Sequence, residues 1–217
     1  MKLKKLLQAV LCTAMVLALA ITAGCGGSDK KSDKKVLKVG MECAYAPYNW
    51  SQPTADGGAV KIAGSNEYAY GYDVMIAKKL ADSMGAELEI HKIEWDGLAP
   101  AVVSGKIDAA IAGMSITSKR KETVDFTKPY YYATVVALVK KDSPQAQAKS
   151  VADLKGSVAT SQLNTIWYDQ IDQVPDVKKL PAIDNVPGMI VALKSGKCNL
   201  IVTDIPTAKA AAFANPE

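Results

Sequence analysis

Hydrophobic and polar positions follow two alternating periods from residue 36 onward. Short β-branched or alternating runs, typical of strands, occupy residues 36–40, 87–93, 107–113, 131–141, 157–161, 176–180 and 199–204. The stretches between and after them predict helices over residues 71–84, 98–105, 165–171, 186–196 and 206–214, and a further helix that starts after Thr117. In the first of these, apolar residues at 72, 76, 80 and 84 mark one face. Strands that alternate with helices at this spacing predict an α/β fold with mainly parallel sheets.

Two breaks divide this pattern. Residues 51–69 are polar and glycine-rich, which predicts a surface loop or hairpin between the first strand and the first helix. A Ser-Pro break near residues 140–150 favours two lobes over one large domain, and we place the first over residues 36–137 and the second over 138–217.

The first 24 residues predict a secretory signal peptide. Three lysines precede an apolar run that extends from Leu6 to about Ala23, long enough for a membrane anchor to be the alternative. Small residues then stand directly before Cys25, which resembles the lipobox of bacterial lipoproteins, although Thr22 stands where leucine is usual. That resemblance implies cleavage before Cys25 and lipidation of its thiol, and residues 25–35 are then a flexible tether.

Charge and cysteine content exclude several functions. Removal of the leader takes away three lysines and lowers the formal net charge from +4 to about +1, so we expect no nucleic-acid partner. Of the four cysteines, Cys43 and Cys198 remain in the mature chain outside the lipidation site, and they form no CxxC motif. We expect no metal and no cofactor, and two unpaired thiols, because a disulfide between lobes would obstruct a hinge.

The chain has none of the common enzyme motifs. It contains no P-loop, GxGxxG, HExxH or GxSxG, and its single histidine, His91, lies on the polar side of an alternating strand. A nucleophile activated by histidine would depend on that one residue.

Functional groups instead gather where the predicted strands end. In open parallel sheets, ligands bind beyond the carboxyl ends of the strands. Those ends carry residues of the types that an amino-acid zwitterion needs: Glu42, Tyr45, Trp95, Gly113, Ser115 and Asp204. The carbonyl of Gly113, the hydroxyl of Ser115 and the carboxylate of Asp204 could accept from an ammonium group. Asp204 is also a plausible helix N-cap, a compatible role because its second carboxylate oxygen stays free.

The basic run after Thr117 is unusual. Thr117 caps a helix whose first turn contains Lys119, Arg120 and Lys121, although the helix dipole disfavours cations there. The planar fork of Arg120 matches a carboxylate, and helix starts at Thr117 and Thr165 could add N–H donors. We expect the two lysines to face water.

The block WDGLAPAVVSGKIDAAIAGMSITSKRKETVDFTKPYY (95–131) resembles the first-lobe core of the extracellular amino-acid-binding proteins of ABC importers. The segments MECAYAPYNW (41–50), GYDVMIAKKLA (71–81) and IVTD (201–204) are similar to the same family, and the similarity runs from about residue 36 to the end. It implies a periplasmic-binding-protein-like (Venus-flytrap) fold, in which two α/β lobes close on a central ligand cleft.

The resemblance also implies residue roles. Arg120 is the carboxylate-binding arginine, Asp204 contacts the ligand, and Tyr45 and Trp95 are the aromatic plates that sandwich its side chain. Glu42 stands where relatives often carry aspartate, which favours a cationic or amide side chain such as that of arginine, lysine, histidine or glutamine.

Two departures from the family pattern stand out. Asn164 replaces the glycine that usually precedes the carboxylate-binding threonine, here Thr165. Relatives also continue beyond the equivalent of Glu217 and return to the first lobe, so we expect either a fragment or an incomplete second lobe, with one hinge crossing at about residues 132–140.

These expectations combine into a receptor that is not an enzyme. It binds a free amino acid by hinge closure and delivers it to the ABC permease subunits, as a monomer at the cell surface or in the periplasm, anchored to the outer face of the cytoplasmic membrane through Cys25. An alternative is an enzyme on the same scaffold, such as a dehydratase of a small carboxylate, with Glu42 or Asp204 as acid or base. A third hypothesis, the sensor module of a larger receptor, is disfavoured by the leader and the lipobox.

Overall fold

The computed structural model describes residues 35–216. The predicted signal peptide (1–24), the lipidation site at Cys25 and the tether up to residue 34 lie outside the described residues. Within the described range, every helix is too short or too polar to cross a membrane.

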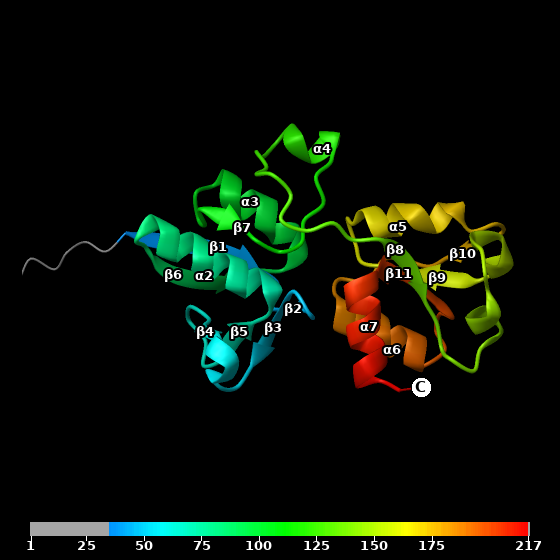
Figure 1. The fold of residues 1–217 in the computed structure, drawn as a ribbon. Coiled ribbons are helices and arrows are strands. Elements are labelled where there is room, and N and C mark those ends of the chain that lie inside the picture. The colour runs from blue at the N-terminus through cyan, green and yellow to red at the C-terminus, as the bar shows by residue number, and fades with distance from the viewer. Residues whose placement is uncertain (1–34, 217) are drawn as a thin grey trace, which may run out of the picture. The chain divides into compact units, whose positions relative to one another are not determined.

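Strands β1 to β5 come first, and from α2 onward strands and helices alternate along the chain (Figure 1). The strands are β1 (Val36–Met41), β2 (Ala44–Tyr45), β3 (Asn49–Gln52), β4 (Val60–Lys61), β5 (Tyr68–Tyr70), β6 (Glu87–Lys92), β7 (Ala109–Ala110), β8 (Val135–Leu138), β9 (Val158–Thr160), β10 (Lys178–Lys179) and β11 (Leu200–Asp204). The α-helices are α2 (Tyr72–Met84), α3 (Leu98–Val103), α4 (Ser118–Lys121), α5 (Ile166–Gln170), α6 (Val186–Lys194) and α7 (Ile205–Ala214). The 3-10 turns are η1 (Asp56–Gly58), η2 (Trp95–Gly97), η3 (Pro144–Gln147), η4 (Val151–Leu154) and η5 (Ile171–Gln173).

These strands form three sheets. The first is parallel with the order β6-β1-β7, and the second has the order β10-β9-β11-β8, parallel except for β8, which is antiparallel to β11. The third is antiparallel, β2-β3-β5-β4, and its strands β3, β4 and β5 include parts of the segment 51–69, so that segment takes the hairpin form of the two alternatives. The mainly parallel α/β prediction is confirmed.

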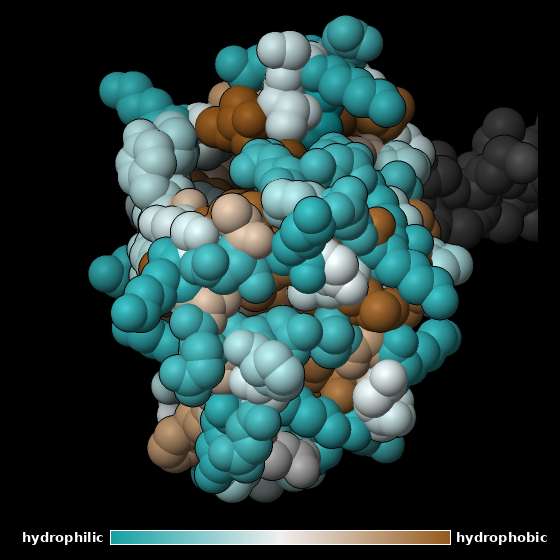
Figure 2. Space-filling view, turned by 90° about the vertical axis from the view of Figure 1, so that its right-hand side faces the viewer, coloured by the Kyte–Doolittle hydropathy of each residue, from teal (hydrophilic) through white to brown (hydrophobic). Residues whose placement is uncertain are grey.

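Two lobes with separate cores result. The first lobe consists of the first and third sheets with α2, α3 and α4, and its core contains Met41, Ile62 and Ile90. The second lobe consists of the second sheet with α5, α6 and α7, around Met189 and Leu200. The exposed face of the molecule in Figure 2 is mainly hydrophilic, with hydrophobic residues in small separate groups, as expected of a surface in contact with water.

Tyr45 and Tyr48 link the two cores. Both follow β1 in the first lobe, yet both pack within the hydrophobic cluster of the second. The two thiols, Cys43 and Cys198, are buried and free, one in each cluster. Burial raises the pKa of Cys43 to about 12, so this thiol stays protonated near neutral pH.

Helix α2 packs through a different face from the one that its apolar spacing predicted. The buried apolar side chains are Val74, Ala77 and Ala81, whereas Leu80 and Met84 are each 39% exposed. The residues at 74, 77 and 81 share a face at three- and four-residue spacing, and alanine lets the helix approach the sheet closely. Gly85 then ends the helix in the left-handed conformation, with φ of 61°.

Several predicted strands are shorter than their sequence pattern, and two of them show why. The run 107–113 pairs only at Ala109 and Ala110, against β1, and the run 131–141 pairs only from Val135 to Leu138, against β11. Pairing needs a neighbour, so the partner sets the length of a strand more than its own residues do.

The chain passes from the first sheet to the second once within the described range, through the irregular residues 122–134 between α4 and β8. Tyr130 within this stretch still packs against the core of the first lobe, and the hinge crossing at about residues 132–140 stays a prediction. The lobe boundary at residues 137 and 138 stays a prediction, with β8 in the second sheet.

Candidate ligand-binding site

One small pocket brings most of the predicted site residues together. Seven of the eight line it: Glu42, Tyr45, Trp95, Gly113, Ser115, Arg120 and Thr165. Ala112, Gln162, Ile166 and Trp167 complete the lining. The enclosed space is about 10 Å³, room for about one water molecule, so the side chains meet across it.

Arg120 reaches this pocket from a single helical turn. Thr117 caps α4 by accepting from the Arg120 backbone N–H at 3.2 Å, as predicted. The guanidinium then donates through Nη1 to the Ser115 carbonyl at 2.7 Å and through Nη2 to the Asn164 carbonyl at 2.8 Å. Partial burial lowers the pKa of Arg120, while Asp169 acts in the opposite direction, and the group stays charged.

Its two basic neighbours behave differently. Lys119 and Lys121 are exposed, as predicted, and neither lines the pocket. The basic run therefore directs only Arg120 into the pocket.

Glu42 is the acidic group of the pocket. It follows β1, is 3% exposed, and its Oε1 accepts from Nε2 of Gln162 at 2.8 Å. Burial raises the pKa of Glu42 to about 7; the Gln162 hydrogen bond opposes the rise, and the charges of Glu94 and Asp96 add to it. Near neutral pH this carboxyl is thus poised between its two protonation states.

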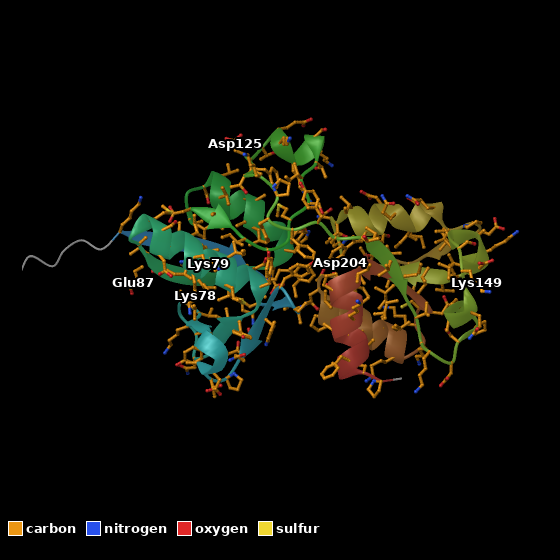
Figure 3. All side chains as sticks on the ribbon, in the orientation of Figure 1. Lys78, Lys79, Glu87, Asp125, Lys149 and Asp204 are labelled. Atoms are coloured by element: carbon orange, nitrogen blue, oxygen red, sulfur yellow. The ribbon has the colours of Figure 1, made fainter. Side chains whose placement is uncertain are left out.

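Asp204 does not line this small pocket. One carboxylate oxygen accepts from the Thr207 N–H at 2.9 Å, which confirms the N-cap of α7. The other accepts from the Tyr45 hydroxyl at 2.5 Å, so the expectation that it stays free is wrong for this conformation. Figure 3 shows Asp204 where β11 meets α7. The prediction that Asp204 contacts the ligand now requires Tyr45 to move.

The two aromatic residues predicted to sandwich the ligand already have protein partners. The Tyr45 ring stacks on Tyr48, with centroids 4.6 Å apart, and lies 5.8 Å from Trp167. The Trp95 ring lies below the Arg120 guanidinium at 5.3 Å, a cation–π distance. That these two rings sandwich the ligand side chain stays a prediction.

The loop that contains Gly113 and Ser115 is held by its backbone. Gly113 has φ of +63°, and a Cβ there would lie 2.8 Å from the Tyr45 ring, so only glycine fits. Its N–H donates to the hydroxyl of Tyr130, which in turn donates to the buried carboxylate of Asp73, both at 2.8 Å. This chain fixes the loop against α2.

Thr165 caps α5 as predicted. Its Oγ1 accepts from the Tyr168 N–H at 3.3 Å and donates to the Gln162 carbonyl at 2.7 Å. A role in binding a ligand carboxylate stays a prediction.

The sequence reasoning missed Gln162, Asn164 and Trp167. Gln162 and Trp167 line the pocket, and Asn164 contributes a backbone carbonyl to Arg120. Gln162 follows the carboxyl end of β9, so the rule about strand ends could have found it. A backbone acceptor such as that of Asn164 leaves no signal in residue type.

A larger cavity of about 520 Å³ adjoins the same residues. It shares Tyr45, Gly113 and Ser115 with the small pocket, and Asp204 also lines it. Arg120 and Glu42 line only the small pocket, whereas Asp108, Asp125, Lys128 and Asp204 line the larger cavity. Among residues 35–216, no three His, Cys, Asp or Glu side chains are grouped to hold a metal ion.

Comparison with known proteins places the chain in a family. Residues 37–179 match the model of the bacterial extracellular solute-binding proteins, family 3. The chain belongs to this family. The two-lobe fold of a periplasmic binding protein follows from this membership and from the solved structures of similar proteins.

Several known binding proteins are similar to this chain. A probable histidine-binding protein of Campylobacter jejuni is 32% identical over 190 residues, which cover 88% of this chain and 68% of the relative. ABC transporter arginine-binding protein 1 of Escherichia coli is 30% identical, with 83% of this chain and 68% of the relative covered. The probable amino-acid-binding protein YxeM of Bacillus subtilis is 32% identical, and the chain spans 62% of its length.

Solved structures of similar proteins superpose on this chain. An ancestral arginine-binding protein bound to glutamine superposes with a TM-score of 0.72 at 34% identity, covering 84% of this chain and 75% of that one. The ancestral amino-acid-binding protein AncCDT-1, a precursor of cyclohexadienyl dehydratase, superposes at 0.70 with 32% identity, covering 82% and 74%.

Proposed function

We propose that this chain binds a free amino acid with a polar or basic side chain between its lobes and delivers it to an ABC permease. The main observation in support of this proposal is that Arg120 and Glu42 line the same pocket, with Trp95 beside them. Arg120 keeps three N–H donors beyond its two protein bonds, enough for a bidentate α-carboxylate. Glu42 supplies the negative charge for a cationic side chain or an acceptor for an amide.

The size of the pocket requires an opening step. Since about 10 Å³ cannot hold an amino acid, the lobes must separate before the ligand enters, and closure then buries it. The ligand carboxylate and side chain take the place of water around Arg120 and Glu42.

The names of the relatives support the amino-acid class. Histidine-, arginine- and cystine-binding proteins are among them, and two of these three ligands have basic side chains.

Calorimetric titration of the full chain against each of the twenty amino acids tests the proposal. The protein is made with Cys25→Ala so that no lipid is attached. We expect micromolar or tighter binding of at least one of arginine, lysine, histidine and glutamine, and weaker binding of the aliphatic amino acids. Absence of binding to all twenty contradicts the proposal.

The proposal extends to the cell. The receptor is a monomer held at the outer face of the cytoplasmic membrane by a lipid on Cys25. Metabolic labelling with a radioactive fatty acid, lost in Cys25→Ala, checks the anchor, and sedimentation of that unlipidated variant checks the monomer.

An enzyme on the same scaffold is the second candidate. The specific observation in its favour is the buried Glu42, whose pKa of about 7 suits a general acid or base, together with the similarity to AncCDT-1. A dehydratase would release product from a small carboxylate, and Glu42→Gln would abolish release while binding persists. Unchanged substrate after incubation with the parent protein excludes this alternative.

A further inference from the structure

Asn164 is unusual in both its conformation and its contacts. It lies in the turn between β9 and α5 with φ of 53°, in the left-handed region that few residues other than glycine adopt.

Three hydrogen bonds connect Asn164 to the first lobe. Its backbone carbonyl accepts from Nη2 of Arg120 at 2.8 Å and from Nε1 of Trp95 at 3.3 Å. Its side-chain Nδ2 donates to Oδ1 of Asp96 at 2.9 Å. One residue of the second lobe thus holds three residues of the first, two of which line the pocket.

The bonds of the backbone carbonyl depend only on the conformation of the turn, whereas the bond of the side chain depends on asparagine. Glycine at this position would keep the left-handed turn without strain, and with it the carbonyl that faces Arg120 and Trp95. Only the bond to Asp96 needs the asparagine side chain. Asparagine tolerates the left-handed region better than most residues, so this extra bond costs little backbone strain.

We propose that Asn164 is a positioning residue and latch of this site: its carbonyl orients Arg120 and Trp95, and its side chain ties the closed lobes together through Asp96. The identity of the retained ligand rests on the proposed function. The latch itself acts on lobe closure, with or without a ligand. A lobe contact of this kind slows the opening step, so it acts on ligand release more than on capture.

The first test measures closure without a ligand. In the protein made without its leader and with Cys25→Ala, spin labels at Lys79→Cys and Lys149→Cys report the distance between the lobes, since both residues are exposed and the native Cys43 and Cys198 are buried. Figure 3 labels both positions, Lys79 on α2 and Lys149 in the second lobe. We expect Asn164→Gly and Asp96→Ala each to shift the distance distribution to longer values, and the double variant to shift it no further than either one.

The second test measures release. Trp95 and Trp167 line the pocket, so their fluorescence follows dissociation of L-arginine, the probe, in a stopped-flow experiment. We expect Asn164→Gly to raise the dissociation rate about fivefold, the effect of one exposed hydrogen bond to a charged group, with an unchanged or higher unfolding temperature. The unchanged unfolding temperature distinguishes the latch from a general structural role.

Asp176→Gly is the matched control. Asp176 also has a positive φ, 51°, in an exposed turn of the second lobe, but its side chain pairs with Lys155 at 3.0 Å, within the same lobe. This variant should change neither the distance distribution nor the rate. Equal distance distributions in Asn164→Gly and its parent overturn the latch. A shifted distribution in a protein that binds none of the twenty amino acids leaves the latch standing and refutes only the proposed ligand.

Discussion

The two lobes contribute different chemistry to the pocket. From the first lobe come both charged lining residues, Glu42 and Arg120, with the ring of Trp95. From the second come only uncharged ones, Gln162, Thr165, Ile166 and Trp167. Asp204, a carboxylate of the second lobe that lines the adjoining larger cavity, is already bonded to Thr207 and Tyr45.

This division has a physical reason. An ionised group that loses water on closure needs a hydrogen-bond partner, and a neutral amide or carbonyl supplies one without adding a second charge to desolvate. Gln162 does this for Glu42, and the Asn164 carbonyl does it for Arg120. The first lobe can therefore select a ligand by charge, while the second closes on it with neutral groups.

This difference between the lobes predicts that, among the substitutions considered, one in the second lobe has the largest effect on stability. Asp204→Ala removes the cap of α7, worth about 1 kcal/mol, and leaves the buried Tyr45 hydroxyl without a partner, worth about 2 kcal/mol more. We expect chemical denaturation to give a free energy of unfolding about 3 kcal/mol lower. Asp204→Asn, which keeps an oxygen for the cap, serves as the control and should lose less. A loss below about 1 kcal/mol in Asp204→Ala would mean that this carboxylate contributes little to the fold.

The largest effect on binding should come from the first lobe. Arg120→Ala removes the charge that we assign to the ligand carboxylate, and we expect calorimetry to show affinity weakened by about 2 kcal/mol or more. Lys119→Ala and Lys121→Ala are matched controls from the same turn and should each change it little, because both side chains are exposed. Equal losses of affinity in all three variants would show that the basic run acts as a diffuse electrostatic surface.

The smallest of these effects is a pH dependence from Glu42. Its carboxyl has a pKa of about 7 because burial penalises the charged form. A cationic ligand binds the ionised form, so below pH 7 binding must first release a proton and affinity falls as the pH falls. Between pH 7.5 and pH 6 we expect L-arginine binding to weaken about eightfold, measured by calorimetry.

Glu42→Gln is the control for this dependence. It should bind L-arginine more weakly at pH 7.5 and show a flat profile between the two pH values. A flat profile in the parent protein would show that Glu42 does not face the ligand side chain.

Much of the fold follows from local sequence patterns. The predictions about the fold that were wrong share one cause. The alternation of strands and helices and the N-caps at Thr117, Thr165 and Asp204 are local features, and the structure confirms them. The buried face of α2 and the ends of β7 and β8 depend on what packs or pairs beside them. No single segment contains that information.

The candidate site divides in the same way. The residue types at the strand ends are visible in the sequence, and the chain order of a parallel sheet already brings Glu42, Trp95 and Arg120 to one edge. Their partners depend on the folded arrangement: Tyr45 occupies the second oxygen of Asp204, Gln162 meets Glu42, and a carbonyl of Asn164 holds Arg120. Hydrogen bonds between residues more than forty positions apart depend on how two lobes meet, and a backbone carbonyl is the same in every residue, so the sequence pattern contains no trace of them.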